Sequence, residues 1–234
     1  MAVKTANTGF RSLPYRSGYV YDWTTKRLYD QHKKFMSIAK LIGNDSKLVL
    51  DLPCGTGFLA RYLHPSTHYE GWDLNHRFLK KIKRDRNKGR IKLKTLTLRQ
   101  QDIFNFDEYP EEKQDTIVFC DILHHVYPRH IELVKNAQNY AKKIIICEPV
   151  AVRPKDNMNG HDLLARVFIK ISKVFPERLI KFLDFLFADN DGINSYEKRS
   201  DWKYNDDSLR HLYHKMGFNK IYRIKDDYIG IWEQ

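Results

Sequence analysis

The stretch Leu-Val-Leu-Asp-Leu-Pro-Cys-Gly-Thr-Gly-Phe-Leu, residues 48–59, decides the fold of this chain. Its apolar first half is typical of a short buried strand, and the strand ends at a carboxylate, Asp51. The chain then turns through Gly55, Thr56 and Gly57, and the apolar residues that start at Phe58 predict a helix. A strand, a carboxylate, a glycine turn and a helix in this order are typical of the nucleotide-binding corner of a doubly wound α/β sheet.

The glycine turn fits two classes of cofactor. Residues 55–60 have the spacing G-x-G-x-x-G/A, which dinucleotide-binding enzymes and S-adenosylmethionine (SAM) enzymes share. Asp51, four residues before the first glycine, favours SAM, because a carboxylate there would repel a pyrophosphate. SAM carries a sulfonium and an ammonium and no phosphate, so a carboxylate suits it.

The segment resembles motif I of the class I SAM-dependent methyltransferases, D/E-x-G-x-G-x-G, and the small-molecule type in particular. Pro53 departs from the motif, because a glycine is usual at its position. Proline can serve there if the position needs a negative φ and no N–H donor. The resemblance implies an α/β fold with a doubly wound, seven-stranded, mostly parallel sheet. A terminal antiparallel hairpin would complete this sheet. The helical cap that we predict after strand five lies outside the resemblance.

Two further acids stand where that family has acids. Asp73 follows a predicted strand, residues 67–72, at 18 residues after Gly55, near the distance at which an acid meets ribose hydroxyls. Asp102 follows another, residues 96–101, and Gln101-Asp102-Ile103 resembles the motif whose acid accepts from the adenine amino group. The resemblance therefore implies a SAM site made by Asp51, Pro53, Cys54, Gly55, Thr56, Gly57, Asp73, Leu74, Asp102, Ile103 and Cys120.

A pair of histidines supplies the candidates for catalysis. Residues 115–121 predict a fourth strand, and His124 and His125 follow at its carboxyl end, which faces the ligand crevice in such sheets. The run Ile-Leu-His-His-Val resembles the V-L-H-H stretch of many small-molecule methyltransferases. Either histidine could act as general base if the acceptor must lose a proton. The alternative is that one of them packs as a hydrogen-bonded core residue.

The rest of the chain divides into four parts. Residues 1–44 form an N-terminal arm with a predicted helix at 23–42 over the cofactor, and residues 45–150 form the SAM-binding core. Residues 151–203 predict a helical cap, because 163–175 carry an apolar stripe and 179–187 are apolar on nearly every side. Residues 204–234 predict a helix from Asp206 and two closing strands at 218–223 and 228–232.

Composition limits the setting. Three cysteines without a CxxC pair argue against a disulfide framework and against a zinc site, and they favour a reducing compartment. No apolar run is long enough to span a bilayer. We expect a cytoplasmic protein. Peripheral association with a membrane and oligomerisation through the cap stay open.

The net charge of +12 is concentrated in residues 76–100, where eleven Lys or Arg residues face a single acid, Asp85. These residues predict a basic helix, then a strand with one wet face from Ile91 onward. Such a patch can bind phosphates of RNA or of anionic lipid, or can simply keep the edge of the sheet soluble.

Three functions remain beside a small-molecule methyltransferase with an apolar or aromatic acceptor. An RNA methyltransferase would use the basic cluster at 77–99, although the Asn/Asp-Pro-Pro-aromatic motif of base-amine methyltransferases is missing after strand four. An NAD(P)-binding oxidoreductase would use the glycine turn. A protein that binds SAM without catalysis would serve as an interaction partner.

Overall fold

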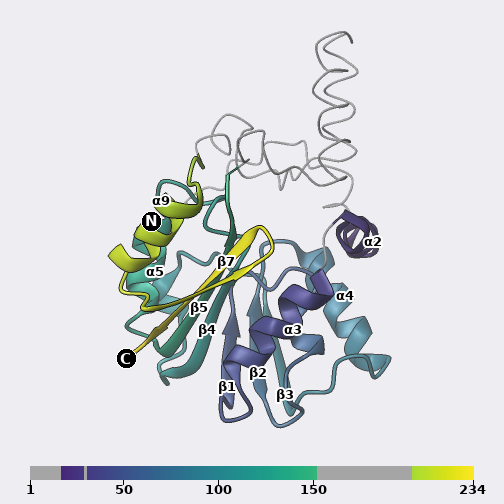
Figure 1. Cartoon of the computed structure of the whole chain (residues 1–234). Coiled ribbons are helices and arrows are strands. Elements are labelled where there is room, and N and C mark those ends of the chain that lie inside the picture. The colour runs from purple at the N-terminus through teal and green to yellow at the C-terminus, as the bar shows by residue number, and fades with distance from the viewer. Residues whose placement is uncertain (1–16, 29–30, 152–201) are drawn as a thin grey trace, which may run out of the picture.

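The computed structural model describes residues 17–28, 31–151 and 202–234, with side chains omitted at 24–28. Its centre is a seven-stranded sheet in the order β3-β2-β1-β4-β5-β7-β6 (Figure 1). The strands are β1 (Leu48–Asp51), β2 (His68–Trp72), β3 (Thr95–Arg99), β4 (Gln114–Cys120), β5 (Ala141–Pro149), β6 (Lys220–Ile224) and β7 (Asp227–Glu233).

All neighbouring strands from β3 to β5 pair in parallel, and β7 is antiparallel to both β5 and β6. The two-residue connection between β6 and β7 forms the terminal hairpin, and Lys225 takes a positive φ of 55° there. The predicted fold class is therefore confirmed for the sheet and its hairpin.

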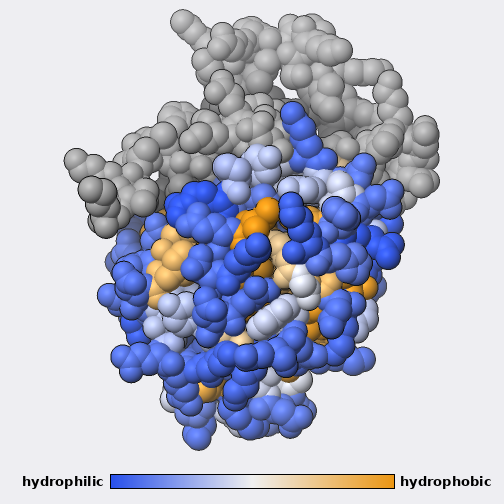
Figure 2. All heavy atoms as spheres, turned by 90° about the vertical axis from the view of Figure 1, so that its left-hand side faces the viewer, coloured by the Kyte–Doolittle hydropathy of each residue, from blue (hydrophilic) through white to orange (hydrophobic). Residues whose placement is uncertain are grey.

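Helices cover both faces of this sheet (Figure 1). Alternate strand residues point to opposite faces, so Leu50 belongs to one hydrophobic core and Val49 to the other. The first core includes side chains of α5 (His130–Ala137) and α9 (Asp206–Lys215), and the second includes those of α3 (Gln31–Ile42) and α4 (His76–Asn87). On the side where α5 and α9 lie, the surface is mostly hydrophilic, with smaller hydrophobic areas between (Figure 2).

Two helix predictions are wrong in extent. Residues 23–42 do not form one helix, because α2 (Gly18–Leu28) ends before α3 begins at Gln31. The helix expected after the glycine turn is only a 3-10 turn, η1 (Leu59–Arg61). The chain has few residues between Gly57 and the start of β2 at His68, and Pro65 disfavours a helix at the residue before it.

The remaining elements lie close to their predicted positions. Ile91 and Leu93 are buried between exposed lysines as expected, but residues 91–94 form no strand and β3 begins at Thr95. A second 3-10 turn, η2 (Phe106–Glu108), precedes β4. Asn205 caps α9, since its side chain accepts from Ser208 N and the Ser208 hydroxyl accepts from Asn205 N.

The cap predicted at 151–203 lies almost wholly outside the described residues, and the four-part division stays a prediction. Among the described helices, none is long and apolar enough to cross a membrane.

Candidate functional site

The carboxyl ends of β1, β2, β3 and β4 meet at one edge of the sheet. Asp51 is in register with Gly71 on one side and with Val118 on the other, and Trp72 is in register with Arg99. The predicted site residues Asp73, Asp102 and Cys120 therefore lie at or just beyond adjacent strand ends. This is the edge at which open α/β sheets bind ligands.

The glycine turn is fixed to β2 by backbone hydrogen bonds. Cys54 N donates to Trp72 O at 2.8 Å, and Gly55 N donates to the Asp73 carboxylate at 3.0 Å. Gly55 and Gly57 have φ values of 52° and 76°, which favour glycine. A Cβ on Gly57 would lie 2.8 Å from Ile82 Cγ1 of α4, so this turn also needs glycine for close packing.

Thr56 connects the same turn to a buried charge network. Its hydroxyl donates to Asp22 of α2, and Asp22 also pairs with Arg61 and Lys81. Arg61 and Lys81 both pair with Asp85, which is 1% exposed. The Lys81 ammonium, Arg61 and Arg90 hold the pKa of the Asp85 carboxyl below its usual value despite burial.

Asp51 is almost fully buried beneath the glycine turn. It is 2% exposed, and its carboxylate accepts a hydrogen bond of 2.7 Å from the Tyr69 hydroxyl. Burial raises the pKa of the Asp51 carboxyl to about 7; the Tyr69 hydrogen bond opposes this rise, and the nearby Asp73 carboxylate adds to it. Burial likewise raises the pKa of the Cys54 thiol, beside these two acids, so the thiol stays neutral.

Asp73 and Asp102 both shape the turns that follow their strands. The Asp73 carboxylate accepts from Asn75 N at 2.7 Å as well as from Gly55 N, so it joins the glycine turn to the start of α4. The Asp102 carboxylate accepts from Phe104 N at 2.9 Å. Of the two apolar residues predicted to contact the cofactor, Ile103 is buried and Leu74 is half-buried.

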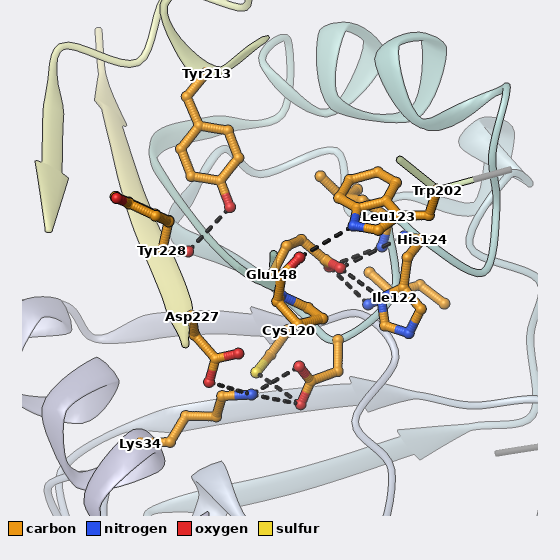
Figure 3. A network of polar contacts seen from close by, with 12 residues as sticks. Lys34, Cys120, Ile122, Leu123, His124, Glu148, Trp202, Tyr213, Asp227 and Tyr228 are labelled. Atoms are coloured by element: carbon orange, nitrogen blue, oxygen red, sulfur yellow. Dashed lines mark hydrogen bonds and ion pairs between the residues drawn. The ribbon is translucent and has the colours of Figure 1, made fainter. Parts of the chain in front are cut away.

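The end of β4 carries a second ionic cluster, in which Lys34 of α3 bridges two acids (Figure 3). Its ammonium lies 2.7 Å from the Asp121 carboxylate and 2.9 Å from that of Asp227, at the start of β7. Burial would lower the pKa of Lys34, but the charges around it, Asp121 first, hold it well above its usual value. Asp121 has a φ of 55°, in the left-handed region that few side chains adopt.

Cys120 precedes Asp121 and points to the same cluster (Figure 3). Its contact with the Cys147 thiol, together with burial, raises the pKa of the Cys120 thiol. The cysteine is therefore neutral, and the charge at the end of β4 comes from Asp121 and Lys34.

His124 is held by a buried glutamate at the end of β5 (Figure 3). Its Nδ1 lies 2.6 Å from a carboxylate oxygen of Glu148, which is fully buried. The other oxygen accepts from Ile122 N and Leu123 N at 2.7 and 2.8 Å. A carboxylate at Nδ1 favours the tautomer with the proton on Nδ1, which leaves the lone pair on Nε2. His125, in contrast, is buried, with its ring centroid 4.2 Å from that of His124.

A group of aromatic rings begins beside His124 at Trp202. Trp202 donates from Nε1 to Pro149 O at 3.0 Å, and its ring lies 6.1 Å from that of His124. His130 packs between Trp202, Tyr204 and the stacked ring of Tyr127. Burial lowers the pKa of His130, so this ring is neutral near pH 7.

Sequence reasoning missed three contributors to this site. Glu148 stands at the end of a predicted strand next to the histidine pair, and this position was a usable signal. Lys34 and Trp202 gave no such signal, because Lys34 comes from α3 and Trp202 from the C-terminal end of the segment predicted as a cap. Within the described residues, no group of His, Cys, Asp and Glu side chains could hold a metal ion.

Comparison with known proteins agrees with this geometry. Residues 50–143 match the family model described as a methyltransferase domain, a range that starts in β1 and ends in β5. No curated protein sequence matches the chain.

Solved structures of methyltransferases share the fold. Magnesium protoporphyrin IX methyltransferase from Synechocystis PCC 6803 with bound SAH is 17% identical with a TM-score of 0.55, over 88% of this chain and 84% of that one. An O-methyltransferase family protein from Burkholderia thailandensis is 16% identical with a TM-score of 0.57, over 93% and 59%. The CurJ carbon methyltransferase is 13% identical with a TM-score of 0.55, over 85% and 53%.

The chain therefore spans little more than half the length of the last two structures. At these identities the likeness shows the fold. Residues 50–143 are thus similar to a methyltransferase domain, and the described residues have the seven-stranded fold that these solved methyltransferases share.

Proposed function

We propose that the protein is a SAM-dependent methyltransferase whose acceptor is a small apolar or aromatic molecule. The observation that carries the proposal is the family match over residues 50–143, because this range contains the glycine turn and the acids after β1, β2 and β3. Whether oxygen, nitrogen or carbon is methylated is left open by the relatives, which include an O-methyltransferase family protein and a carbon methyltransferase.

The chemistry of the described residues fits SAM. The turn offers bare backbone at Gly55, and the carboxyls of Asp51 and Asp73 lie close enough for one to raise the pKa of the other. Because two neighbouring carboxylates repel each other, a cation beside them is stabilising and a pyrophosphate is destabilising. Asp73 is the acid we assign to the ribose, and Asp102 the one we assign to the adenine.

SAM supplies a methyl group on a cationic sulfur, and its transfer disperses charge, so alignment and a dry pocket provide most of the acceleration. The chain's own contribution is to orient the acceptor and to accept its proton if it has one to lose. We assign the proton to His124 Nε2, because Glu148 holds the ring through Nδ1. His125, packed in the interior, is the weaker of the two predicted bases.

The aromatic side chains near His124 support the choice of acceptor. Tyr127, His130, Trp202 and Tyr204 form a continuous set of ring contacts at the carboxyl ends of β4 and β5. An acceptor site beside these rings favours flat apolar ligands.

Calorimetry with SAM and with S-adenosylhomocysteine tests the cofactor part of the proposal. We expect both to bind the wild-type protein, and Asp73→Asn to weaken binding by about tenfold or more, because a charge-assisted hydrogen bond contributes about 1.5–3 kcal/mol. Asparagine keeps an acceptor for Gly55 N but replaces the oxygen that accepts from Asn75 N with an amide nitrogen, so urea unfolding of the variant is measured alongside to show that the turn is intact.

The matched control is Asp45→Asn, an exposed acid in the turn before β1, which should bind SAM as the wild type does. Equal affinity in Asp73→Asn and wild type would overturn the assignment of Asp73. Binding of NADH and not of SAM would favour the alternative of an NAD(P)-binding oxidoreductase.

A further inference from the structure

A cluster of exposed cations lies along α4 and the segment after it. Six exposed side chains make up this cluster, which we call the basic edge: Lys80, Lys83, Arg84, Lys88, Lys92 and Lys94. None of them takes part in an ion pair with another described residue. Asp85, the one acid of this segment, is buried and already paired with Lys81, Arg61 and Arg90. Among the described residues, the basic edge therefore faces solvent with no acid paired to it.

Exposed aromatic side chains lie on the helix that packs beside α4 (Figure 1). The ring of Tyr21 on α2 contacts that of Phe78 on α4, with centroids 5.0 Å apart. On the same helix, Tyr19 is 43% exposed and Trp23 is 58% exposed. Large aromatic side chains are rarely left this open. The Lys81 ammonium of α4 lies 5.6 Å from the centroid of the Tyr19 ring, so Tyr19 adjoins the helix that carries part of the basic edge.

A shallow hollow of about 290 Å³ lies beside the basic edge, between α4 and the edge strand β3. Lys83, Arg86, Asn87 and Leu96 line it. Two cations and an amide over an apolar floor suit a phosphate-bearing group with a short apolar attachment.

We propose that the basic edge, together with Tyr19 and Trp23, binds the headgroups of an anionic lipid bilayer. Lysines on an exposed helix are attracted to the negative surface of such a bilayer, and Trp and Tyr favour the boundary between headgroups and hydrocarbon. The inference does not depend on the proposed methyl transfer.

Two observations favour lipid over single-stranded nucleic acid. Five of the six cations are lysines, which act as point charges and lack the guanidinium plane that stacks on bases. The ring of Tyr19 has the Lys81 ammonium 5.6 Å from its centroid, so only its other face is left for a stacked base.

Vesicle sedimentation tests the inference. The full chain should sediment with vesicles of phosphatidylcholine containing phosphatidylserine as about one third of the lipid, and stay in solution with phosphatidylcholine alone. Binding should weaken strongly between about 0.1 M and about 0.5 M salt. The triple variant Lys83→Gln, Arg84→Gln, Lys88→Gln should lose about tenfold or more in apparent affinity. The double variant Tyr19→Ser, Trp23→Ser should also bind less.

The matched control removes three exposed cations from α5 and α9: Lys135→Gln, Arg210→Gln and Lys215→Gln. It should bind vesicles as the wild type does, and both triple variants should bind SAM equally in calorimetry. Absence of vesicle binding, or equal losses in the two triple variants, would overturn the inference. So would tighter binding of a labelled single-stranded RNA than of vesicles, since the basic edge would then be a nucleic-acid surface.

Discussion

Burying Asp51 beside Tyr69 makes one carboxyl sensitive to pH in the neutral range. The unfolded chain ionises this group near pH 4 and the folded chain only near pH 7, so between these values the folded state holds one more proton. Its contribution to stability is complete below about pH 4 and is lost as the pH rises through 7, by about 1.4 kcal/mol per pH unit.

Asp51→Asn should remove that loss while its amide oxygen still accepts from the Tyr69 hydroxyl. We expect urea unfolding to show that the free energy of unfolding of the variant, relative to that of the wild type, is about 2–3 kcal/mol higher at pH 8 than at pH 5. A cationic ligand favours the ionised carboxyl, so wild-type SAM affinity should rise with pH through 7. Parallel stability curves for wild type and Asp51→Asn would contradict the buried, protonated carboxyl, and exposed Asp45→Asn is the control.

The pair of His124 and Glu148 gives a second prediction for single residues. If the carboxylate holds the Nδ1 proton, nitrogen NMR of the wild type should show the Nδ1–H tautomer of His124. Glu148→Gln should shift the ring away from this tautomer, because an amide can donate to Nδ1 as well as accept from it. In a panel of phenols, SAH formation should fall by about a hundredfold in His124→Asn with little change in SAM affinity. Equal activity in His124→Asn and wild type would leave His124 a structural residue.

At the scale of helices and strands, the sequence predicted what depends on local pattern. Val49, Ile117 and Ile145 sit in short runs of apolar and β-branched residues, and all seven strands appear within a few residues of their predicted ends. The predictions of helix and strand were wrong where contacts with distant parts of the chain determine the local structure. The helix after Gly57 is cut short by Pro65 and by the need to reach β2, and residues 91–94 are held by contacts such as that of Arg86 with Leu93 O.

Packing of the glycine turn against α4 predicts a cost for any side chain at Gly57. Gly57→Ala places a Cβ 2.8 Å from Ile82 Cγ1 and also at a φ of 76°. Gly89→Ala is the matched control, since its φ is 68° and nothing lies within 4 Å of its Cβ. In urea unfolding, we expect the control to lose about 1 kcal/mol in the free energy of unfolding, and Gly57→Ala to lose about 1–3 kcal/mol more than the control.

The clash can be separated from the backbone strain by a double variant. Ile82→Ala removes the atoms that the new Cβ would meet, so Gly57→Ala should cost less in the Ile82→Ala background than in wild type. Equal costs in both backgrounds would mean that packing against α4 does not constrain the turn.

Across the whole molecule, the site is assembled by contacts that join distant parts of the sequence. Asp22, Arg61 and Asp85 tie α2 to the glycine turn and α4, and Lys34 ties α3 to β4 and β7. No local pattern indicates which lysine of a helix will be buried beside two acids. The sequence therefore predicted the strand-end acids of the candidate site, and it missed the groups that hold them from neighbouring elements.

Lys34 is the sharpest test of that long-range assembly. Lys34→Met leaves the carboxylates of Asp121 and Asp227 close together without their cation, and Asp227 already has a pKa raised mainly by burial. We expect a loss of about 3 kcal/mol in the free energy of unfolding, at the low end for a broken buried pair because both acids keep some contact with water. Lys40→Met, an exposed lysine in the last turn of the same helix, should cost less than about 0.5 kcal/mol. Adding Asp227→Asn to Lys34→Met should restore part of the loss, since only one carboxylate then remains. If Lys34→Met costs no more than Lys40→Met, the bridge does not hold α3 against the carboxyl ends of the strands.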